Sequence, residues 1–151
     1  MEIALYQPEI APNVGTLIRL GACMNVTVHI IEPCGFPFGA KDLRRAVMDY
    51  ANIANVIRHS SWDRFERTTK LQRHILLTTK SSICYTDFQY RNDDILLLGQ
   101  ESSGVPDNIH KSCEGSVTIP MRQDARSINM AVATAMVLGE ALRQTGGFPT
   151  A

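Results

Sequence analysis

The stretch Asp94–Gly99 reads Asp-Ile-Leu-Leu-Leu-Gly and is the most hydrophobic run of strand length in the chain. Four successive apolar residues leave no polar face, which is typical of a parallel strand that is covered on both sides. The glycine that follows at once marks the turn out of such a strand. This stretch therefore favours an α/β fold with a mostly parallel sheet.

The same pattern repeats on both sides of this stretch. Apolar runs predict further strands at residues 2–6, 26–31, 53–57, 74–79 and 116–119. Capping and spacing predict helices that begin near Asn13, span 43–50, run from Ser61 to about Arg73, open at Pro106 and cover 127–144. Strands that alternate with helices are the mark of a parallel sheet flanked by helices.

Ligands of open α/β sheets bind outside the carboxyl ends of the strands. We therefore expect a ligand site in the loops that follow Tyr6, Thr79, Leu98 and Ile119.

The composition fits a single globular domain over residues 1–151. Fifteen basic residues balance fifteen acidic ones, which excludes a chain that coats nucleic acid or an anionic membrane by bulk charge. No apolar run approaches the ~20 residues of a membrane span. The first residues also lack the basic region and cleavage site of a signal peptide. We expect a cytoplasmic protein.

Basic residues are concentrated in residues 41–73, which contain eight basic and four acidic residues. Lys41, Arg44 and Arg45 open this segment. Each of them singly is best explained as part of a solvated helix face, but as a group they are able to form the local patch that a polyanion needs.

The cysteines and histidines do not predict a metal site. Cys23, Cys34, Cys84 and Cys113 include no CxxC pair, and the histidines do not fall at ligand spacing beside them. We expect reduced, mostly structural thiols and no metal.

The segment Gly99–Pro106 spaces its glycines like a phosphate-binding loop, but Val105 stands where that motif requires a lysine. No G-x-G-x-x-G occurs either, so a dinucleotide fingerprint is absent. The segment is explained by a strand-to-helix turn, although a turn alone does not need the carboxylate of Glu101. A loop that presents backbone groups to a nucleoside is the functional alternative.

Two further segments combine polar and apolar residues in an unusual way. Pro12–Arg19 places a cation on an otherwise apolar helix, so Arg19 is either a surface arginine or a guanidinium aimed at an anion. Ile119–Met130 runs from a strand through a polar loop into a helix, and Ser127 and Asn129 are both candidates for its N-cap. The helix that follows is apolar nearly all round, which requires burial on several sides or in a subunit interface.

In chain order, the segments Pro12–Arg19, Gly99–Pro106 and Ile119–Met130 resemble motifs one, two and three of the SPOUT methyltransferases, which use S-adenosylmethionine to methylate RNA. The resemblance covers residues 2–144. Residues 5–10, 30–33, 43–46 and 77–80 are similar to the tRNA (cytidine/uridine-34) 2'-O-methyltransferase group, which acts at the wobble position. Ser103 and Gly139 stand where that group commonly has arginine and tyrosine.

The resemblance implies a C-terminal trefoil knot, a homodimer and a tRNA anticodon stem-loop as substrate. Carried over by position, it implies a cofactor pocket built from Leu77, Thr78, Thr79, Gly99, Glu101, Ile119, Met121, Ser127 and Asn129. From the local charge we expect RNA to be bound by Lys41, Arg44, Arg45 and the basic residues of 58–73, together with Arg122 and Arg126.

The implied catalytic residues are Arg19, Asn13 and Glu101. A guanidinium is effectively never deprotonated in proteins, so we interpret Arg19 as a phosphate clamp that stabilises the developing alkoxide, oriented by Asn13 and Glu101. Two alternatives remain: the same class of enzyme acting on ribosomal RNA, and an RNA-binding protein that keeps the fold without catalysis. Retention of Arg19, Glu101, Ser127 and Asn129 together favours an enzyme, because binding alone would not require all four.

Overall fold

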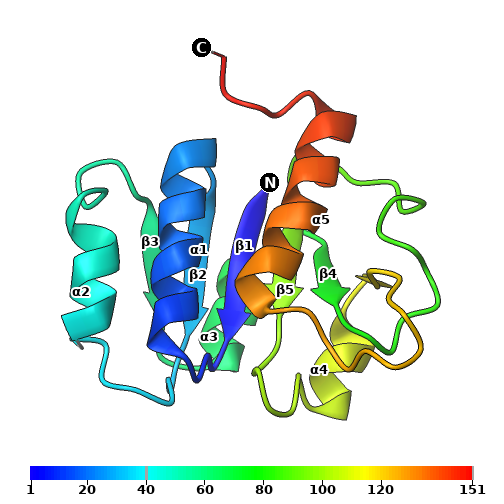
Figure 1. Cartoon of the computed structure of the whole chain (residues 1–151), viewed down its shortest axis with the longest axis horizontal. Coiled ribbons are helices and arrows are strands. Elements are labelled where there is room, and N and C mark those ends of the chain that lie inside the picture. Colours follow the sequence, from blue (N-terminus) through cyan, green and yellow to red (C-terminus); the bar gives the residue numbers. More distant parts are fainter. Residues whose placement is uncertain (40, 151) are drawn as a thin grey trace.

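The computed structural model describes residues 1–39 and 41–150 and contains one six-stranded sheet (Figure 1). Its strands are β1 (Glu2–Tyr6), β2 (Thr27–Ile31), β3 (Val56–His59), β4 (His74–Leu77), β5 (Ile95–Leu98) and β6 (Gly115–Val117). They lie in the order β3-β2-β1-β5-β4-β6, and every pair of neighbours is parallel. The prediction of an α/β fold with a parallel sheet is confirmed.

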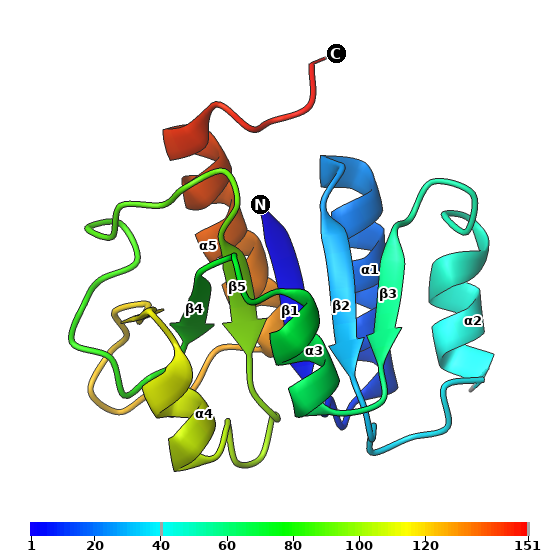
Figure 2. The same cartoon turned by 180° about the vertical axis from the view of Figure 1, so that it is seen from behind.

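Five helices cover the two faces of this sheet in the described part of the chain. They are α1 (Ala11–Met24), α2 (Lys41–Met48), α3 (Trp62–Thr68), α4 (Asp107–Ser112) and α5 (Met130–Thr145). Helices α1, α2 and α5 lie on one face (Figure 1), and α3 and α4 lie on the other (Figure 2). Within the described residues, no helix combines the length and the apolar character that a membrane span requires.

The core has one layer on each face of the sheet because successive residues of a strand point to opposite sides. In β1, Ile3 and Leu5 join the larger cluster under α1 and α5. Ala4 and Tyr6 join a smaller cluster around Phe65 of α3. The predicted double coverage of the apolar strands therefore holds for β1 as well as for β5, all of whose residues are buried.

Two predicted helix starts were wrong by several residues. Helix α1 begins at Ala11, its N-cap Ile10 has no side-chain cap, and Asn13 lies inside the first turn. Helix α5 begins at Met130, so of the two candidate N-caps Asn129 is confirmed and Ser127 precedes the helix. The cap at Ser61 and the end of α5 at a left-handed Gly146 agree with the sequence.

Two other predicted boundaries shifted by several residues, and local backbone hydrogen bonds account for the first of them. The amides of Ile53 and Ala54 both donate to the carbonyl of Tyr50, so these residues form turns after α2 and β3 starts only at Val56. Helix α3 ends at Thr68, well before Arg73.

Arg73 has a structural partner that the sequence did not reveal. Its guanidinium donates to both carboxylate oxygens of the fully buried Asp94, across 2.8 and 2.7 Å. Hydrogen bonding to Asp94 raises the pKa of Arg73 above its ordinary value. Arg73 therefore anchors the start of β5 and does not belong to a free basic patch.

Candidate functional site

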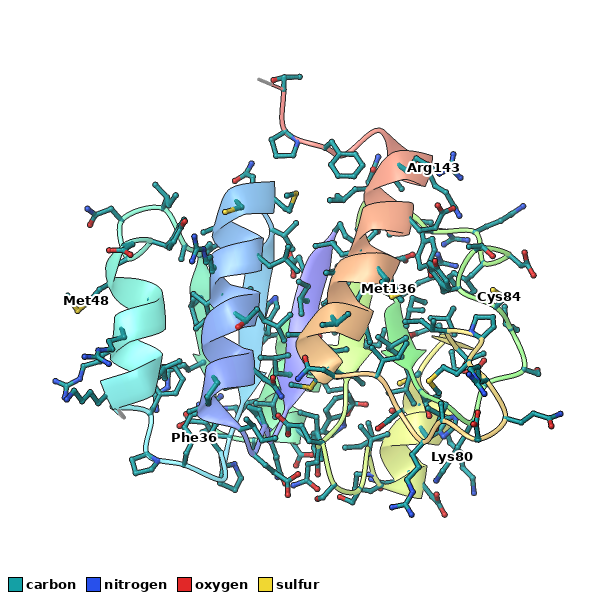
Figure 3. The ribbon with its side chains drawn as sticks, viewed as in Figure 1. Phe36, Met48, Lys80, Cys84, Met136 and Arg143 are labelled. Atoms are coloured by element: carbon teal, nitrogen blue, oxygen red, sulfur yellow. The ribbon has the colours of Figure 1, made fainter. Side chains whose placement is uncertain are left out.

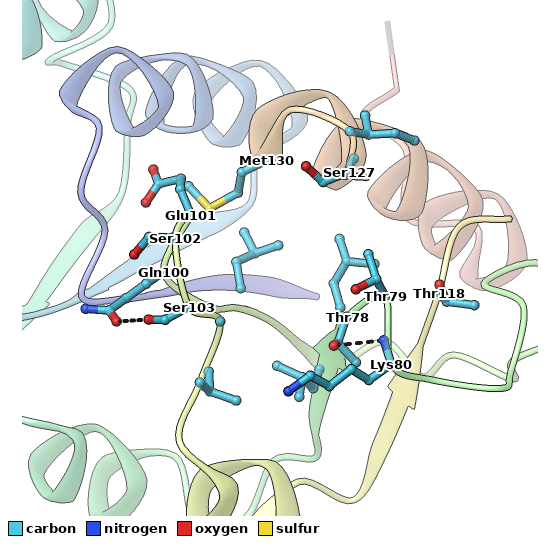
Figure 4. A pocket seen from close by; sticks show the side chains of 18 of the residues that line it. Thr78, Thr79, Lys80, Gln100, Glu101, Ser102, Ser103, Thr118, Ser127 and Met130 are labelled. Atoms are coloured by element: carbon cyan, nitrogen blue, oxygen red, sulfur yellow. Dashed lines mark hydrogen bonds between the residues drawn. The ribbon is translucent and has the colours of Figure 1, made fainter. Parts of the chain in front are cut away.

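The carboxyl ends of the central strands surround a cavity of about 610 Å³ (Figure 4). Residues from each of the four predicted loops line it. In Figure 4, Gln100–Ser103 form one wall and Thr78–Lys80 with Thr118 form the wall opposite. Ser127 and Met130 close the cavity from the segment that leads into α5. This volume is in the range of small-molecule and cofactor sites.

The loop after β5 is a tight turn that closes on itself. The backbones of Gln100 and Gly104 exchange two hydrogen bonds of 2.8 and 2.9 Å. A Cβ on Gly99 would lie 2.4 Å from the carbonyl carbon of Gly104, and Gly104 itself has a φ of 69°. Both glycines are therefore required by close approach and by a left-handed backbone, as the sequence prediction of a turn implied.

Glu101 points from this turn to the start of α1. Its carboxylate accepts hydrogen bonds from the amides of Glu9 at 2.9 Å and Ile10 at 3.3 Å, and from Nδ2 of Asn13 at 3.3 Å. A negative charge there satisfies unpaired amides and complements the helix dipole. This long-range cap replaces the local N-cap that α1 lacks.

Asn13 joins this turn to α5. It is 7% exposed, and its Oδ1 accepts a 3.0 Å hydrogen bond from Nδ2 of Asn129. The Oδ1 of Asn129 in turn accepts from the amides of Ala131 and Val132. The three sequence segments that stand apart in the chain therefore meet in one hydrogen-bonded wall.

Every residue expected to bind the cofactor lines the cavity. These residues are Leu77, Thr78, Thr79, Gly99, Glu101, Ile119, Met121, Ser127 and Asn129. Sequence reasoning missed Lys80 and His110, which also line it. Lys80 directly follows Thr79 and was within reach of the strand-end rule, whereas nothing in the sequence distinguished His110 on α4.

The expected catalytic residues are only partly together. Asn13 and Glu101 line the cavity and bond to each other, but Arg19 does not line it. The exposed guanidinium of Arg19 lies 4.9 Å from the centre of the Tyr50 ring, beyond the end of α2. Within one chain, Asn13 and Glu101 therefore orient each other and the α1 terminus instead of Arg19.

The expected RNA-binding residues lie outside the cavity. Lys41, Arg44 and Arg45 are exposed on α2. Arg122 and Arg126 are exposed in the segment before α5, where Arg122 pairs with Asp124 at 3.1 Å. The structure thus separates two basic groups on the surface.

The four cysteines are free thiols. Burial raises the pKa of Cys34 to about 11 and that of Cys113 to about 12, so both are protonated near neutral pH. Among residues 1–39 and 41–150, no three His, Cys, Asp or Glu side chains are grouped to hold a metal ion.

The fold and the cavity define an α/β protein with a small-molecule site at the carboxyl ends of its parallel strands. The chain belongs to the SpoU rRNA Methylase family, whose model matches residues 1–139. It is 52% identical over 147 residues to a tRNA (cytidine(34)-2'-O)-methyltransferase of Beijerinckia indica subsp. indica, covering 95% of this chain and 91% of the relative. It is 48% identical over 150 residues to the protein of that name from Ancylobacter novellus, covering 98% and 95%.

Solved structures show the same similarity. One, described as giving structural insights into the 2-OH methylation of C/U34 on tRNA, matches with a TM-score of 0.89 and 32% identity, covering 95% of this chain and 94% of that one. An AdoMet-bound rRNA methyltransferase from Sinorhizobium meliloti matches with a TM-score of 0.84 and 25% identity, covering 94% of this chain and 55% of that one.

Proposed function

We propose that this protein transfers a methyl group from S-adenosylmethionine to the ribose 2'-hydroxyl of the wobble nucleotide 34 of tRNA, a cytidine or a modified uridine. The observation that carries the proposal is the convergence of the three motif segments on one cavity. Relatives that bear the name of this activity match nearly the whole chain.

The cavity fits the cofactor. Apolar side chains of Leu77, Ile119, Met121 and Met130 suit an adenine ring and a methionine chain. The side chains of Thr78 and Ser127 provide hydroxyl groups in the same walls. Gly99 lets the turn close on itself beside the cavity, because a side chain there would collide with the backbone of Gly104.

When bound, S-adenosylmethionine supplies a methyl group on a sulfonium, which is a good leaving group. The protein must then hold the ribose hydroxyl in line with that methyl group, and such alignment is able to supply ~7–11 kcal/mol of the barrier. We assign Arg19 to clamp the neighbouring phosphate and stabilise the developing alkoxide. Asn13 and Glu101 hold the cavity wall in place.

We further propose a homodimer. The outer side of α5 presents Val132 and Met136, which are 54% and 40% exposed, and Figure 3 shows Met136 on this outer side. Ala135 and Gly139 continue the same stripe at helical spacing. A second copy covering this stripe explains its apolar character, and we propose that Arg19 acts on the cavity of that second copy, because it does not line its own.

The remaining assignments concern the whole chain. We propose that residues 1–151 act as one domain in the cytoplasm, bind the anticodon stem-loop and need no metal. We also propose a trefoil knot formed by the segment after β6. In support, the backbone of Thr118 bonds to both Ile83 and Tyr85, so the segment after β6 runs against the connection from β4 to β5 before it leads to α5.

The test is methylation of unmodified tRNA transcripts with S-adenosylmethionine, followed by mass spectrometry of the digested RNA. The expected product is a 2'-O-methylated nucleotide 34. Transcripts with a 2'-deoxy nucleotide at position 34 serve as the control and should remain unmethylated. Methylation of ribosomal RNA but not of tRNA would replace the proposed substrate. If the protein binds RNA but never methylates it, the proposal that it is an enzyme is wrong.

A further inference from the structure

Two carboxylates from distant parts of the chain cap each other's backbone. Glu101, in the turn after β5, accepts from the amides of Glu9 and Ile10. Glu9, in the loop after β1, accepts from the amide of Ser102 at 2.9 Å and from its hydroxyl at 2.8 Å. Each loop therefore receives the carboxylate of the other.

This pairing keeps two negative charges in neighbouring loops, which would be unfavourable without compensation. Hydrogen bonds from the backbone and the hydroxyl of Ser102 hold the pKa of Glu9 below its usual range, so Glu9 is charged at neutral pH. A third link joins the same two loops, since Nε2 of Gln100 donates to Oε1 of Gln7 at 3.3 Å. Gln7 has a left-handed φ of 44°, a conformation that a non-glycine residue adopts only when its surroundings hold it.

The two carboxylates differ in their relation to the cavity. Glu101, Ser102 and Gly104 line it, whereas Glu9 does not. Glu9 is only partly buried and belongs to neither of the two core clusters. Its carboxylate accepts from Ser102, in the turn that forms one wall of the cavity.

We propose that Glu9 is a positioning residue of the cofactor pocket: through Ser102 it holds the turn Gly99–Gly104 in the conformation that completes the cavity wall. The proposal rests on the proposed cofactor site and assigns no chemistry to Glu9 itself. Hydrogen bonds to charged groups are stronger than those between neutral groups. Losing the bonds between Glu9 and Ser102 should therefore lower the affinity of the cavity for S-adenosylmethionine.

The experiment is isothermal titration of the full-length protein with S-adenosylmethionine. The variants are Glu9→Ala, Glu9→Gln, Ser102→Ala and the double variant Glu9→Ala with Ser102→Ala. Glu114→Ala is the matched control, because Glu114 also accepts a backbone amide, that of His74 at 2.7 Å, but at the amino end of β4, away from the cavity. Hydrogen exchange of the Ser102 amide is measured on the same proteins without ligand.

We expect Glu9→Ala to weaken cofactor binding about tenfold, equivalent to about 1.4 kcal/mol, and to speed exchange at Ser102. Glu9→Gln should recover part of the affinity because its amide oxygen still accepts from Ser102. Ser102→Ala should weaken binding less than Glu9→Ala, because it removes the hydroxyl bond and keeps the amide bond. It should have no further effect in Glu9→Ala, where both bonds are already lost. Glu114→Ala should bind the cofactor like the wild type.

Unchanged affinity in Glu9→Ala, an additive double variant, or exchange at Ser102 that does not change would each overturn the proposal. A loss in Glu114→Ala equal to that in Glu9→Ala would show a general loss of stability and would overturn it as well. These outcomes are independent of RNA methylation: a wild-type protein that binds S-adenosylmethionine but leaves tRNA unmethylated contradicts the proposed function and not the role of Glu9.

Discussion

The side-chain amide of Asn129 donates a 3.0 Å hydrogen bond to the side-chain oxygen of Asn13 and so ties the N-cap of α5 to the first turn of α1. The direction of this bond is determined by its neighbours. Nδ2 of Asn13 donates to Glu101, and Oδ1 of Asn129 accepts from backbone amides. Each amide therefore has one orientation that satisfies both of its ends.

Asn129 both caps α5 and donates to Asn13, and one substitution is able to remove the second role while keeping the first. Asn129→Asp keeps an oxygen that caps Ala131 and Val132, so the stability of α5 should be nearly retained. It removes the donor to Asn13 and brings a second carboxylate to the wall that holds Glu101. In calorimetric titration we expect S-adenosylmethionine to bind at least tenfold more weakly, a loss of at least ~1.4 kcal/mol.

Asn129→Ala serves as the comparison, because it removes the cap as well and should cost about 0.5–2 kcal/mol in urea unfolding. Equal cofactor affinity in Asn129→Asp and the wild type would contradict a role for the Asn13–Asn129 bond in the site.

Gly99→Ala should damage the site without unfolding the sheet. Its new Cβ would meet the backbone of Gly104 at 2.4 Å, so the turn must open. We expect loss of cofactor binding by titration, with a circular dichroism spectrum like that of the wild type. Gly39→Ala is the control, since a Cβ there meets nothing within 4 Å. If Gly99→Ala binds as tightly as Gly39→Ala, the turn does not form the cofactor wall.

Much of this site was predictable because it follows from local chemistry. Four apolar residues before Gly99 indicate a covered strand, and the strand-end rule then places the ligand whatever the exact boundaries are. The predicted place of the ligand site is therefore correct even though the predicted starts of α1 and α5 were wrong. Thr78 and Ile119 lie in the cavity just beyond the ends of β4 and β6, although the predicted strands ran through both residues and the resemblance named them.

Features that depend on distant partners were not predictable. Arg73 was grouped with other cations because nothing near it in the sequence indicates Asp94, 21 residues away. The start of α1 depends on a carboxylate from Glu101, so the local signal at Asn13 was misleading. Where a side chain such as Arg19 lies is likewise decided by the packing of α1 beside α2 and Tyr50.

Three of the four histidines are buried under α3, which predicts that acid destabilises the fold. His29 bonds to His59 at 2.8 Å and to Glu2 at 2.6 Å, and His74 bonds to Thr69 at 2.8 Å. Burial is the main cause that lowers the pKa of His59 and His74 below the ordinary 6.5. The unfolded chain then binds more protons than the folded one as the pH falls below 6.5, so stability decreases in that direction.

Urea unfolding at pH 7.5 and 5.5 tests this expectation. The midpoint should be lower at pH 5.5 with an unchanged slope, and His59→Gln should reduce the difference. His110→Gln is the control, because His110 lines the cavity and lies outside this cluster. A urea midpoint that rises between pH 7.5 and 5.5 would contradict the prediction that the buried histidines destabilise the fold in acid.

The basic residues of α2 should contribute to tRNA binding through phosphate contacts. Arg44 and Arg45 are exposed and free to reach a backbone. Replacing both with alanine should weaken binding and flatten the slope of log affinity against log salt by about 0.7–0.9 per lost contact. Filter binding over a range of KCl concentrations measures both. Arg91→Ala, near the amino end of β5, is the control. If the double variant has the same affinity and salt slope as Arg91→Ala, these α2 side chains do not bind tRNA and form only a solvated face.

Arg19→Ala should abolish most methyl transfer and leave cofactor binding nearly intact, because Arg19 is exposed and does not line the cavity. The loss should be about 10²–10³ in rate, or ~2.7–4 kcal/mol, the effect of removing one preorganised donor from a charge-stabilising site. Arg19→Lys should rescue only in part, since an ammonium does not grip a phosphate with two parallel bonds. Single-turnover methylation and calorimetric titration separate the two quantities.

The same substitution tests the dimer. If Arg19 acts on the cavity of a second copy, mixing Arg19→Ala with Gly99→Ala creates heterodimers in which one cavity is intact and faces an intact Arg19. Activity should then return in the mixture, although each variant alone is inactive. Arg19→Ala mixed with itself is the control for dilution and exchange of subunits. Activity that does not return would place Arg19 in its own chain's site, and a fully active Arg19→Ala would remove it from the reaction.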